Sequence, residues 1–215
     1  MKVLLRLGAL LIVTAMLPVH VQADAGTDVR TLQHAWEQAK YMTPEKEQEK
    51  TLEALSKRAG EVKQQYPDSA EAEIWYAIVM STYAGAKGGI GALSLVKDAK
   101  KSLEHALQID PKALNGSAYT SLGSLYYQVP GWPIGFGNDD KARELLQKAL
   151  EINPDGIDPN YFYGDFLFRQ RDYDGAIKAL QKALQAPPRP DRPLADEGRK
   201  REIQDLLAKI EAKRN

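Results

Sequence analysis

The chain of 215 residues carries 29 basic and 29 acidic residues, so its formal net charge is zero. This balance offers no basic face and argues against nucleic acid or an anionic membrane as a partner. The absence of cysteine excludes disulfides, thiolate catalysis and cysteine metal sites.

The first 23 residues have the pattern of a secretory signal peptide. Lys2 and Arg6 form a short basic region, residues 7–17 are mostly apolar, and the small residues of a cleavage site end at Ala23. The apolar stretch is too short to span a membrane. We therefore expect cleavage after Ala23, a periplasmic location and no membrane span in the mature form; the alternative is a buried N-terminal helix. No cysteine follows the cleavage site, so we do not expect a lipoprotein.

Three later segments share one spacing of alanine and proline. In each, alanine recurs after seven residues and proline follows five residues later. Seven residues are two helical turns, so both alanines lie on one face, where their small size lets a neighbouring helix approach closely. Proline then ends the segment because it cannot continue a helix. The three sets are Ala99/Ala106/Pro111, Ala142/Ala149/Pro154 and Ala176/Ala183/Pro188.

Aromatic helical segments with a glycine precede the last two of these segments. Gly164 lies twelve residues before Ala176, and Pro154 and Pro188 are 34 residues apart. In these features residues 28–188 resemble the tetratricopeptide repeat, a helix–turn–helix unit of about 34 residues. The resemblance implies an all-α fold, a right-handed α-solenoid of about four helical hairpins. We expect the hairpins over residues 28–67, 69–111, 114–154 and 157–188 within a solenoid of residues 24–188, the first hairpin being divergent.

A proline-rich linker and a last helix are expected over residues 189–215. The stretch "PPRPDRP" at 187–193 is stiff and extended. The helix that follows has an apolar stripe formed by Ile203, Leu206, Leu207 and Ile210. The last repeat of a solenoid leaves an apolar face uncovered, so we expect this helix to cap it. The alternative is a helix that recruits a partner.

Two of the repeats are longer than the last one. Gly123 precedes Ala142 by nineteen residues, which places seven extra residues in "VPGWPIGFG" at 129–137. The preceding repeat has its own excess at 85–92. Both excesses fall between the two helices of a hairpin, and insertions at that connection map to one face of a helical array. We therefore expect two inserted loops along one rim of the concave surface.

The resemblance also implies that the first helix of each hairpin lines the concave surface. Tyrosine and tryptophan suit a binding surface because they combine apolar area with a polar group at low entropic cost. The candidate partner-binding residues are Tyr76, Tyr83, Tyr127, Trp132, Phe136, Tyr161, Asp165, Phe168 and Arg169. The register of the second repeat is open by one residue. Core packing is the alternative role of each aromatic side chain, and a plug between repeats is the alternative for Trp132.

No catalytic or metal-binding set stands out. After removal of the signal peptide only His34 and His105 remain as histidines, each alone on an expected helix. "GAKGGIG" at 85–91 lacks the Lys-Ser/Thr ending of a phosphate-binding loop. We therefore expect no enzymatic activity, no cofactor and no metal. An enzyme would need a deep pocket with perturbed carboxylates around Asp165.

The function that these features favour is binding. We expect a periplasmic interaction module that binds a partner protein or peptide through its concave face and the two loops. The alternative is a small apolar ligand or lipid, bound by an accessory component of a transport system. The chain is similar in general terms to the T-component of TRAP transporters, but it lacks that family's lipid-anchor cysteine. A closed apolar cavity favours the alternative, and an open groove favours a peptide or protein.

Overall fold

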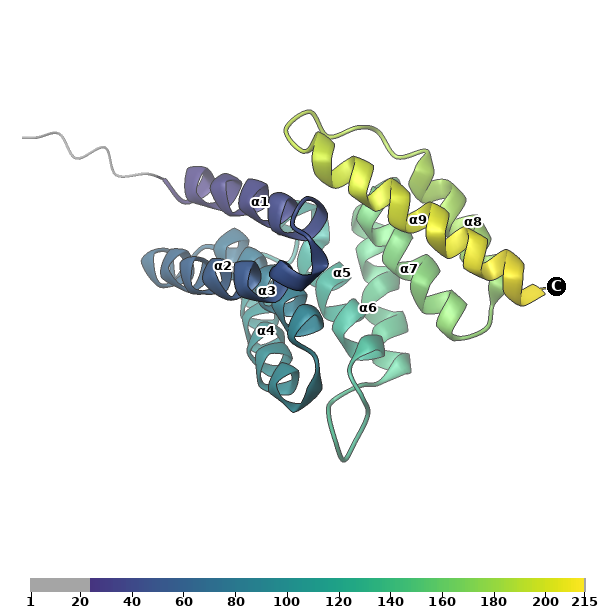
Figure 1. The fold of residues 1–215 in the computed structure, drawn as a ribbon, viewed down its shortest axis with the longest axis horizontal. Coiled ribbons are helices and arrows are strands. Elements are labelled where there is room, and N and C mark those ends of the chain that lie inside the picture. The colour runs from purple at the N-terminus through teal and green to yellow at the C-terminus, as the bar shows by residue number, and fades with distance from the viewer. Residues whose placement is uncertain (1–23, 215) are drawn as a thin grey trace, which may run out of the picture.

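Residues 24–214 are the part of the chain that the computed structural model describes, and this part forms nine α-helices with a single isolated β-bridge (Figure 1). The expected signal peptide lies outside the described residues. None of the nine helices is both long and apolar enough to cross a bilayer. The helices are α1 (Ala25–Tyr41), α2 (Glu45–Gln65), α3 (Ala70–Lys87), α4 (Gly89–Ile109), α5 (Ala113–Gln128), α6 (Asp139–Ile152), α7 (Ile157–Arg169), α8 (Tyr173–Leu184) and α9 (Pro193–Arg214).

The first eight helices pack as four successive hairpins. Each odd-numbered helix packs against the next even-numbered one, and each of α1, α3 and α5 also packs against the first helix of the following hairpin. The last helix, α9, covers α7 and α8. The expected all-α solenoid of about four hairpins with a C-terminal capping helix is confirmed.

Small residues allow the two helices of a hairpin to approach closely. All six alanines of the repeated spacing have no exposed surface. A Cβ added at Gly164 would lie 2.8 Å from Leu180 Cγ, and one added at Gly123 would lie 2.8 Å from Leu146 Cγ. These glycines are therefore required by packing, since the backbone conformation at both is ordinary for a helix.

Three apolar clusters follow one another along the array. The first lies between the first two hairpins, the second between the second and third, and the third between the third hairpin, the last hairpin and α9. The expected stripe of α9 enters the third cluster with Ile203, Leu206 and Ile210 buried and Leu207 partly buried. The apolar core is therefore distributed over all the repeats. Each large side chain that is fully buried stabilises the fold by about 1.5–3 kcal/mol.

The prediction of a loop at residues 85–92 is wrong. The helix α3 continues to Lys87 and α4 begins at Gly89, so only Gly88 separates them. Gly88 and Gly89 have φ angles of 63° and 61°, which a residue with a Cβ rarely adopts. The extra residues of this repeat therefore lengthen both helices and move the corner between them outward.

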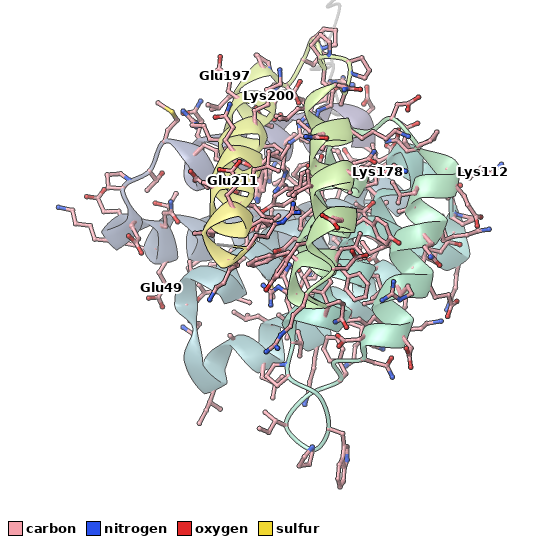
Figure 2. The ribbon with its side chains drawn as sticks, turned by 90° about the vertical axis from the view of Figure 1, so that its right-hand side faces the viewer. Glu49, Lys112, Lys178, Glu197, Lys200 and Glu211 are labelled. Atoms are coloured by element: carbon pink, nitrogen blue, oxygen red, sulfur yellow. The ribbon has the colours of Figure 1, made fainter. Side chains whose placement is uncertain are left out.

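The loop expected at 129–137 is present and projects from the body of the molecule, below the helices in Figures 1 and 2. Its two arms meet at a neck, where the isolated bridge joins Gly131 to Gly137. A Cβ at Gly137 would lie 2.0 Å from the carbonyl oxygen of Val129. Glycine is therefore needed for the arms to meet. Phe136 anchors the base of the loop by packing edge-on against Tyr126, with ring centroids 5.5 Å apart.

The helix α9 also returns to the beginning of the chain. It packs against α1 as well as against the last hairpin. Its outer side carries charged residues, among them Glu197, Lys200 and Glu211 in Figure 2. The contact with α1 joins the first and last hairpins and closes one side of the concave surface. Nothing in the periodicity of the sequence pointed to this closure.

Candidate functional site

A cavity of about 1080 Å³ lies on the concave side of the array. Side chains from α1, α3, α5, α7 and α9 line it, so every hairpin contributes to its wall. A smaller cavity of about 330 Å³ lies beside it, and Arg189 and Arg192 line both spaces. The two arginines therefore stand between a larger and a smaller compartment.

The mouth of the larger cavity is apolar. Ile90 at the corner between α3 and α4 and Ile134 in the loop both border it. Their side chains are 94% and 67% exposed. Trp132, at the tip of the same loop, is 90% exposed, so it is not a plug between repeats. Large apolar side chains gathered at one opening are typical of an interaction site.

The middle of the wall presents hydroxyl groups. Ser81, Ser117 and Ser124 line the cavity, and each donates its hydrogen to a main-chain carbonyl of its own helix, at 2.7–2.8 Å. A hydroxyl group that donates its hydrogen in this way can still accept hydrogen bonds through its oxygen. The wall can therefore receive N–H donors such as those of a peptide main chain.

Three of the expected residues from α7 lie at the cavity wall. They are Tyr161, Asp165 and Arg169. The Nε atom of Arg169 is 3.5 Å from Oδ2 of Asp165, and the buried Tyr127 donates its hydroxyl hydrogen to the same oxygen at 2.8 Å. Burial, with the charge of Asp165, holds the pKa of Tyr127 well above its usual value. Tyr127 therefore acts as a buried support for Asp165.

The second repeat presents a different register. Trp75, Ile78 and Thr82 line the cavity, whereas Tyr76 and Tyr83 pack into the apolar clusters. The inward face of α3 therefore begins one residue earlier than the candidate tyrosines. Because the register was open by one residue, the candidate tyrosines are the neighbours of the residues that line the cavity.

Two further candidates pack against their neighbours. Phe168 contacts Tyr173, with ring centroids 6.0 Å apart. Phe136 lies against Tyr126 and has the ammonium group of Lys100 5.7 Å from its ring. Both side chains therefore have the core-packing role that was the alternative for the aromatic residues.

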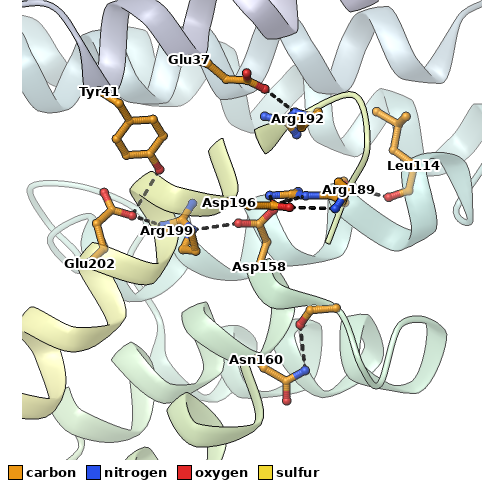
Figure 3. A network of polar contacts seen from close by, with 12 residues as sticks. Glu37, Tyr41, Leu114, Asp158, Asn160, Arg189, Arg192, Asp196, Arg199 and Glu202 are labelled. Carbon is orange, nitrogen blue, oxygen red and sulfur yellow. Dashed lines mark hydrogen bonds and ion pairs between the residues drawn. The ribbon is translucent and has the colours of Figure 1, made fainter. Parts of the chain in front are cut away.

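The side of the cavity opposite the mouth is made by residues 187–202, which we call the strap (Figure 3). Arg192 of the strap donates from Nε to Oε1 of Glu37 at 2.6 Å. Its guanidinium carbon lies 4.9 Å from the ring of Trp75 and 5.9 Å from that of Trp36. We call the group of Trp36, Glu37 and Trp75 the Trp pocket. It fastens the strap to the first two hairpins.

A second arginine fastens the strap to the last hairpin. Arg199 donates from Nε to Oδ1 of Asp158 at 2.8 Å. Its guanidinium carbon lies 4.2 Å from the ring of Tyr161 and 4.8 Å from that of Phe162. We call Asp158, Tyr161 and Phe162 the Tyr pocket. Arg189 adds a bond to the other oxygen of Asp158, at 2.7 Å.

The charges of the strap set the protonation of the groups around it. Burial alone would raise the pKa of Asp158, but the positive charges of the strap arginines, Arg199 foremost, hold that pKa well below its usual range. Burial raises the pKa of Tyr161 to about 12, against the opposing charge of Arg199. Asp158 is therefore ionised and Tyr161 is neutral at any physiological pH.

Sequence reasoning missed the strap residues as part of the site. The only local signal was the pair of arginines in "PPRPDRP", which reads as a linker. Glu37 and Arg192 are separated by 155 residues, so no periodicity relates them. The pairing of Arg192 in the linker with Glu37 on α1 is therefore visible only in the tertiary structure.

A cluster of serine, histidine, lysine and glutamate joins three helices away from the cavity. Glu73 accepts hydrogen bonds from Ser102 and, at 2.9 Å, from His105 Nδ1. Lys63 lies 3.1 Å from the same carboxylate. Both Ser102 and Glu73 are buried, which keeps substrates away. Residues 24–214 hold no group of three or more metal-binding side chains. The Glu73 cluster therefore joins α2, α3 and α4.

Gly198 sets how closely the strap lies against α1. A Cβ at this position would lie 2.5 Å from three ring atoms of Tyr41. Alanine favours a helix by about 1 kcal/mol over glycine. We nevertheless expect Gly198→Ala to lower the free energy of unfolding by about 1–2 kcal/mol, because overpacking outweighs this gain. Urea denaturation measures the change.

The matched control is Gly60→Ala in α2, where a Cβ meets only Tyr76, at 3.8 Å. We expect this variant to gain about 0.5–1 kcal/mol. If Gly198→Ala and Gly60→Ala raised the free energy of unfolding equally, the close approach of Gly198 to Tyr41 would not affect stability.

Comparison with known proteins finds a match to one repeat family over part of the chain and three solved structures at low identity. Residues 136–196 match the family model of the tetratricopeptide repeat. No curated protein sequence matches the chain. Among solved structures, yeast Tom70 is 18% identical with a TM-score of 0.47, over 86% of this chain and 35% of Tom70. A thermophilic tetratricopeptide repeat protein of Thermus thermophilus is 14% identical (TM-score 0.46, 87% of this chain and 98% of the other).

A third solved structure, pilF of Pseudomonas aeruginosa, is 18% identical with a TM-score of 0.35, over 85% of this chain and 90% of the other. The chain thus spans about a third of yeast Tom70, the first of these structures. Likeness at this level supports no conclusion about ligands or partners of this chain.

Proposed function

We propose that this chain, a member of the tetratricopeptide repeat family, is a non-catalytic periplasmic module that binds an extended segment of a partner protein in its concave cavity. The fold is that of a protein–protein interaction module. The partner enters between the corner of α3 and α4 and the loop at 129–137, and its main chain meets the hydroxyl groups of the wall.

One observation carries this proposal over its alternative. The exposed side chains of Ile90 and Ile134 border the cavity, and Trp132, two residues before Ile134 in the loop, is 90% exposed and does not line it. A small ligand enclosed in the cavity would leave Trp132 in water. A protein that enters the cavity and also rests on its rim would cover it, and exposed tryptophan is frequent among residues that dominate binding energy.

The alternative function is the binding of a small amphiphilic ligand. The closure of the cavity by the strap favours it, because a solenoid that only grips proteins needs no such closure. A volume of about 1080 Å³ is also at the upper end of pockets for small ligands. The experiment must therefore separate a macromolecule from a small molecule.

A photo-crosslinking amino acid at position 134 provides this test in periplasmic extract. We expect crosslinked protein at this position and none from the same group at Lys178, which is exposed on α8 (Figure 2). Trp132→Ala is expected to lower the crosslink yield about tenfold or more. Its melting temperature should not change, because the side chain is 90% exposed.

Two results would overturn the proposal. One is equal crosslinking from positions 134 and 178. The other is a protein that shows no crosslink at position 134 and retains a small molecule in native mass spectrometry, which would establish the alternative instead.

A further inference from the structure

We propose that the Trp pocket and the Tyr pocket together form an arginine-binding peptide site on the wall of the concave cavity, which we call the groove. The chain's own strap occupies this site. A partner segment with arginines in a proline-rich stretch binds by displacing the strap. This inference concerns a surface separate from the mouth of the cavity and goes beyond the function proposed above.

The two pockets of the groove have the composition of arginine-binding sites. Each contains two aromatic rings and one carboxylate that accepts from Nε of the arginine, at 2.6 Å for Glu37 and 2.8 Å for Asp158. Aromatic faces attract a guanidinium group, and a carboxylate bonds it with directional hydrogen bonds. Lysine would reproduce the charge but neither the planar stacking nor the fork of donors.

The two pockets lie on different repeats and bind different parts of the strap. The Trp pocket belongs to the first two hairpins and holds Arg192, which directly precedes α9. The Tyr pocket belongs to α7 and holds Arg199, within the first turns of α9. A ligand that fills both needs a turn that ends in an arginine, followed directly by a helix that carries a second arginine seven residues later. The groove therefore recognises a conformation as well as two side chains.

The strap is held in a way that permits exchange. Of residues 187–195, only Ala195 is a buried apolar residue, while the four prolines of this stretch are exposed. The apolar stripe that anchors α9, from Ile203 to Ile210, lies beyond the strap. Polar contacts exchange for contacts with water at small net cost compared with apolar burial. The strap can thus leave the groove while the second half of α9 stays packed on the last hairpin.

The Trp pocket also has a hydrogen-bond donor that the strap does not use. Nε1 of Trp75 is buried and is the one buried side-chain polar atom between residues 24 and 214 without a hydrogen-bond partner. An unpaired buried donor is unfavourable. A partner peptide that places a carbonyl oxygen against this atom would gain a bond that the strap lacks, which gives the partner an advantage over the intramolecular occupant.

The test uses a fluorescent peptide with the sequence of residues 186–199 and a control peptide with alanine at the position of Arg192. In the wild-type protein the strap competes at an effective concentration in the millimolar range, so micromolar peptide binds weakly. Arg192→Ala removes the anchor of the strap and leaves the Trp pocket empty. We expect this variant to bind the native peptide at least about tenfold more tightly than the wild-type protein does.

Three controls determine where the peptide binds. The control peptide should bind Arg192→Ala at least about tenfold more weakly than the native peptide. Adding Glu37→Gln to that variant should weaken the native peptide to a similar extent, because the pocket loses its charge. Lys178→Ala, at an exposed position on α8, should leave peptide binding unchanged. Equal affinity for both peptides, or loss of binding in Lys178→Ala, would overturn the proposal.

Hydrogen exchange on the wild-type protein gives a measurement that needs no variant. Excess native peptide should speed the exchange of the amides of residues 194–199, since these leave the groove, and the control peptide should not. Unchanged exchange at saturating native peptide would also overturn the proposal. Neither measurement involves the crosslink at position 134, so this inference and the function proposed for the mouth can fail independently.

Discussion

Asp158→Ala is expected to lower the free energy of unfolding by about 2–4 kcal/mol, because the 31% exposed carboxylate pairs with Arg199, whose side chain is only 9% exposed. The carboxylate accepts from Arg189 at 2.7 Å and from Arg199 at 2.8 Å. Arg199 is only 7% exposed while the strap is in place, so loss of Asp158 removes a partner from its buried charge unless the strap itself opens. Denaturation in urea, with the strap followed by hydrogen exchange, measures both the loss and its location.

Asp155→Ala is the matched control for this substitution. Asp155 also pairs with a basic residue, Lys182 at 3.3 Å, but its side chain is 77% exposed. Exposed pairs are worth about 0–1 kcal/mol, so the control should lose less than about 1 kcal/mol. A similar loss in both variants would mean that the strap network adds nothing to an ordinary surface pair.

The pH dependence of stability provides a second measurement of the same interaction. The pKa of Asp158 lies well below its usual range in the folded protein, whereas in the unfolded chain it is about 3.9. The carboxylate therefore contributes stability above the unfolded value, and this contribution is lost as the pH falls below about 4. Between pH 5 and 8 the wild-type protein and Asp158→Ala should differ by a constant amount, and the difference should shrink in acid.

Glu73→Ala is expected to lower the free energy of unfolding by about 2–4 kcal/mol. Its carboxylate is almost fully buried and is bonded to Ser102, His105 and Lys63, which come from two neighbouring helices. The side chain of Lys63 is 32% exposed and can partly turn to water, which makes the loss smaller than for a fully enclosed pair. The measurement is again urea denaturation.

Glu73→Gln separates charge from packing at this position. Burial would raise the pKa of Glu73, but the hydrogen bonds from Ser102, His105 and Lys63 outweigh it and lower the pKa below its usual value. Glutamine keeps the size and an acceptor, so we expect it to lose about half as much stability as alanine. Equal losses would show that the charge carries the whole effect.

The regular part of the fold could be predicted because it depends on contacts that are close in sequence. The seven-residue spacing of alanine and the glycine twelve residues before Ala176 are consequences of two adjacent helices packing within one hairpin. The excess at 129–137 could be placed for the same reason. Its aromatic residues could not be assigned, because exposure of Trp132 and packing of Phe136 depend on the arms of the loop.

The errors arose where packing overrides local preference. Glycines at 85, 88, 89 and 91 favoured a loop, but long helices that pack along their whole length leave only Gly88 between α3 and α4. In α3, apolar and aromatic residues occupy several faces of the helix, so the sequence does not show which face points into the cavity. The orientation against α1 and α5, and not the apolar pattern itself, selects Trp75 and Thr82 for the cavity.

The sequence by itself determined the unit of this protein: helical hairpins with small residues at their contacts, prolines at their ends, one projecting loop and a terminal helix with an apolar stripe. Periodic side-chain patterns specify such units because each helix buries the face that its neighbours in the chain cover. Only the tertiary structure decided that α9 reaches α1 and that the strap arginines fill the groove. Those contacts join residues about 40 to 160 positions apart. A single ion pair between such distant residues leaves no repeating pattern in the sequence.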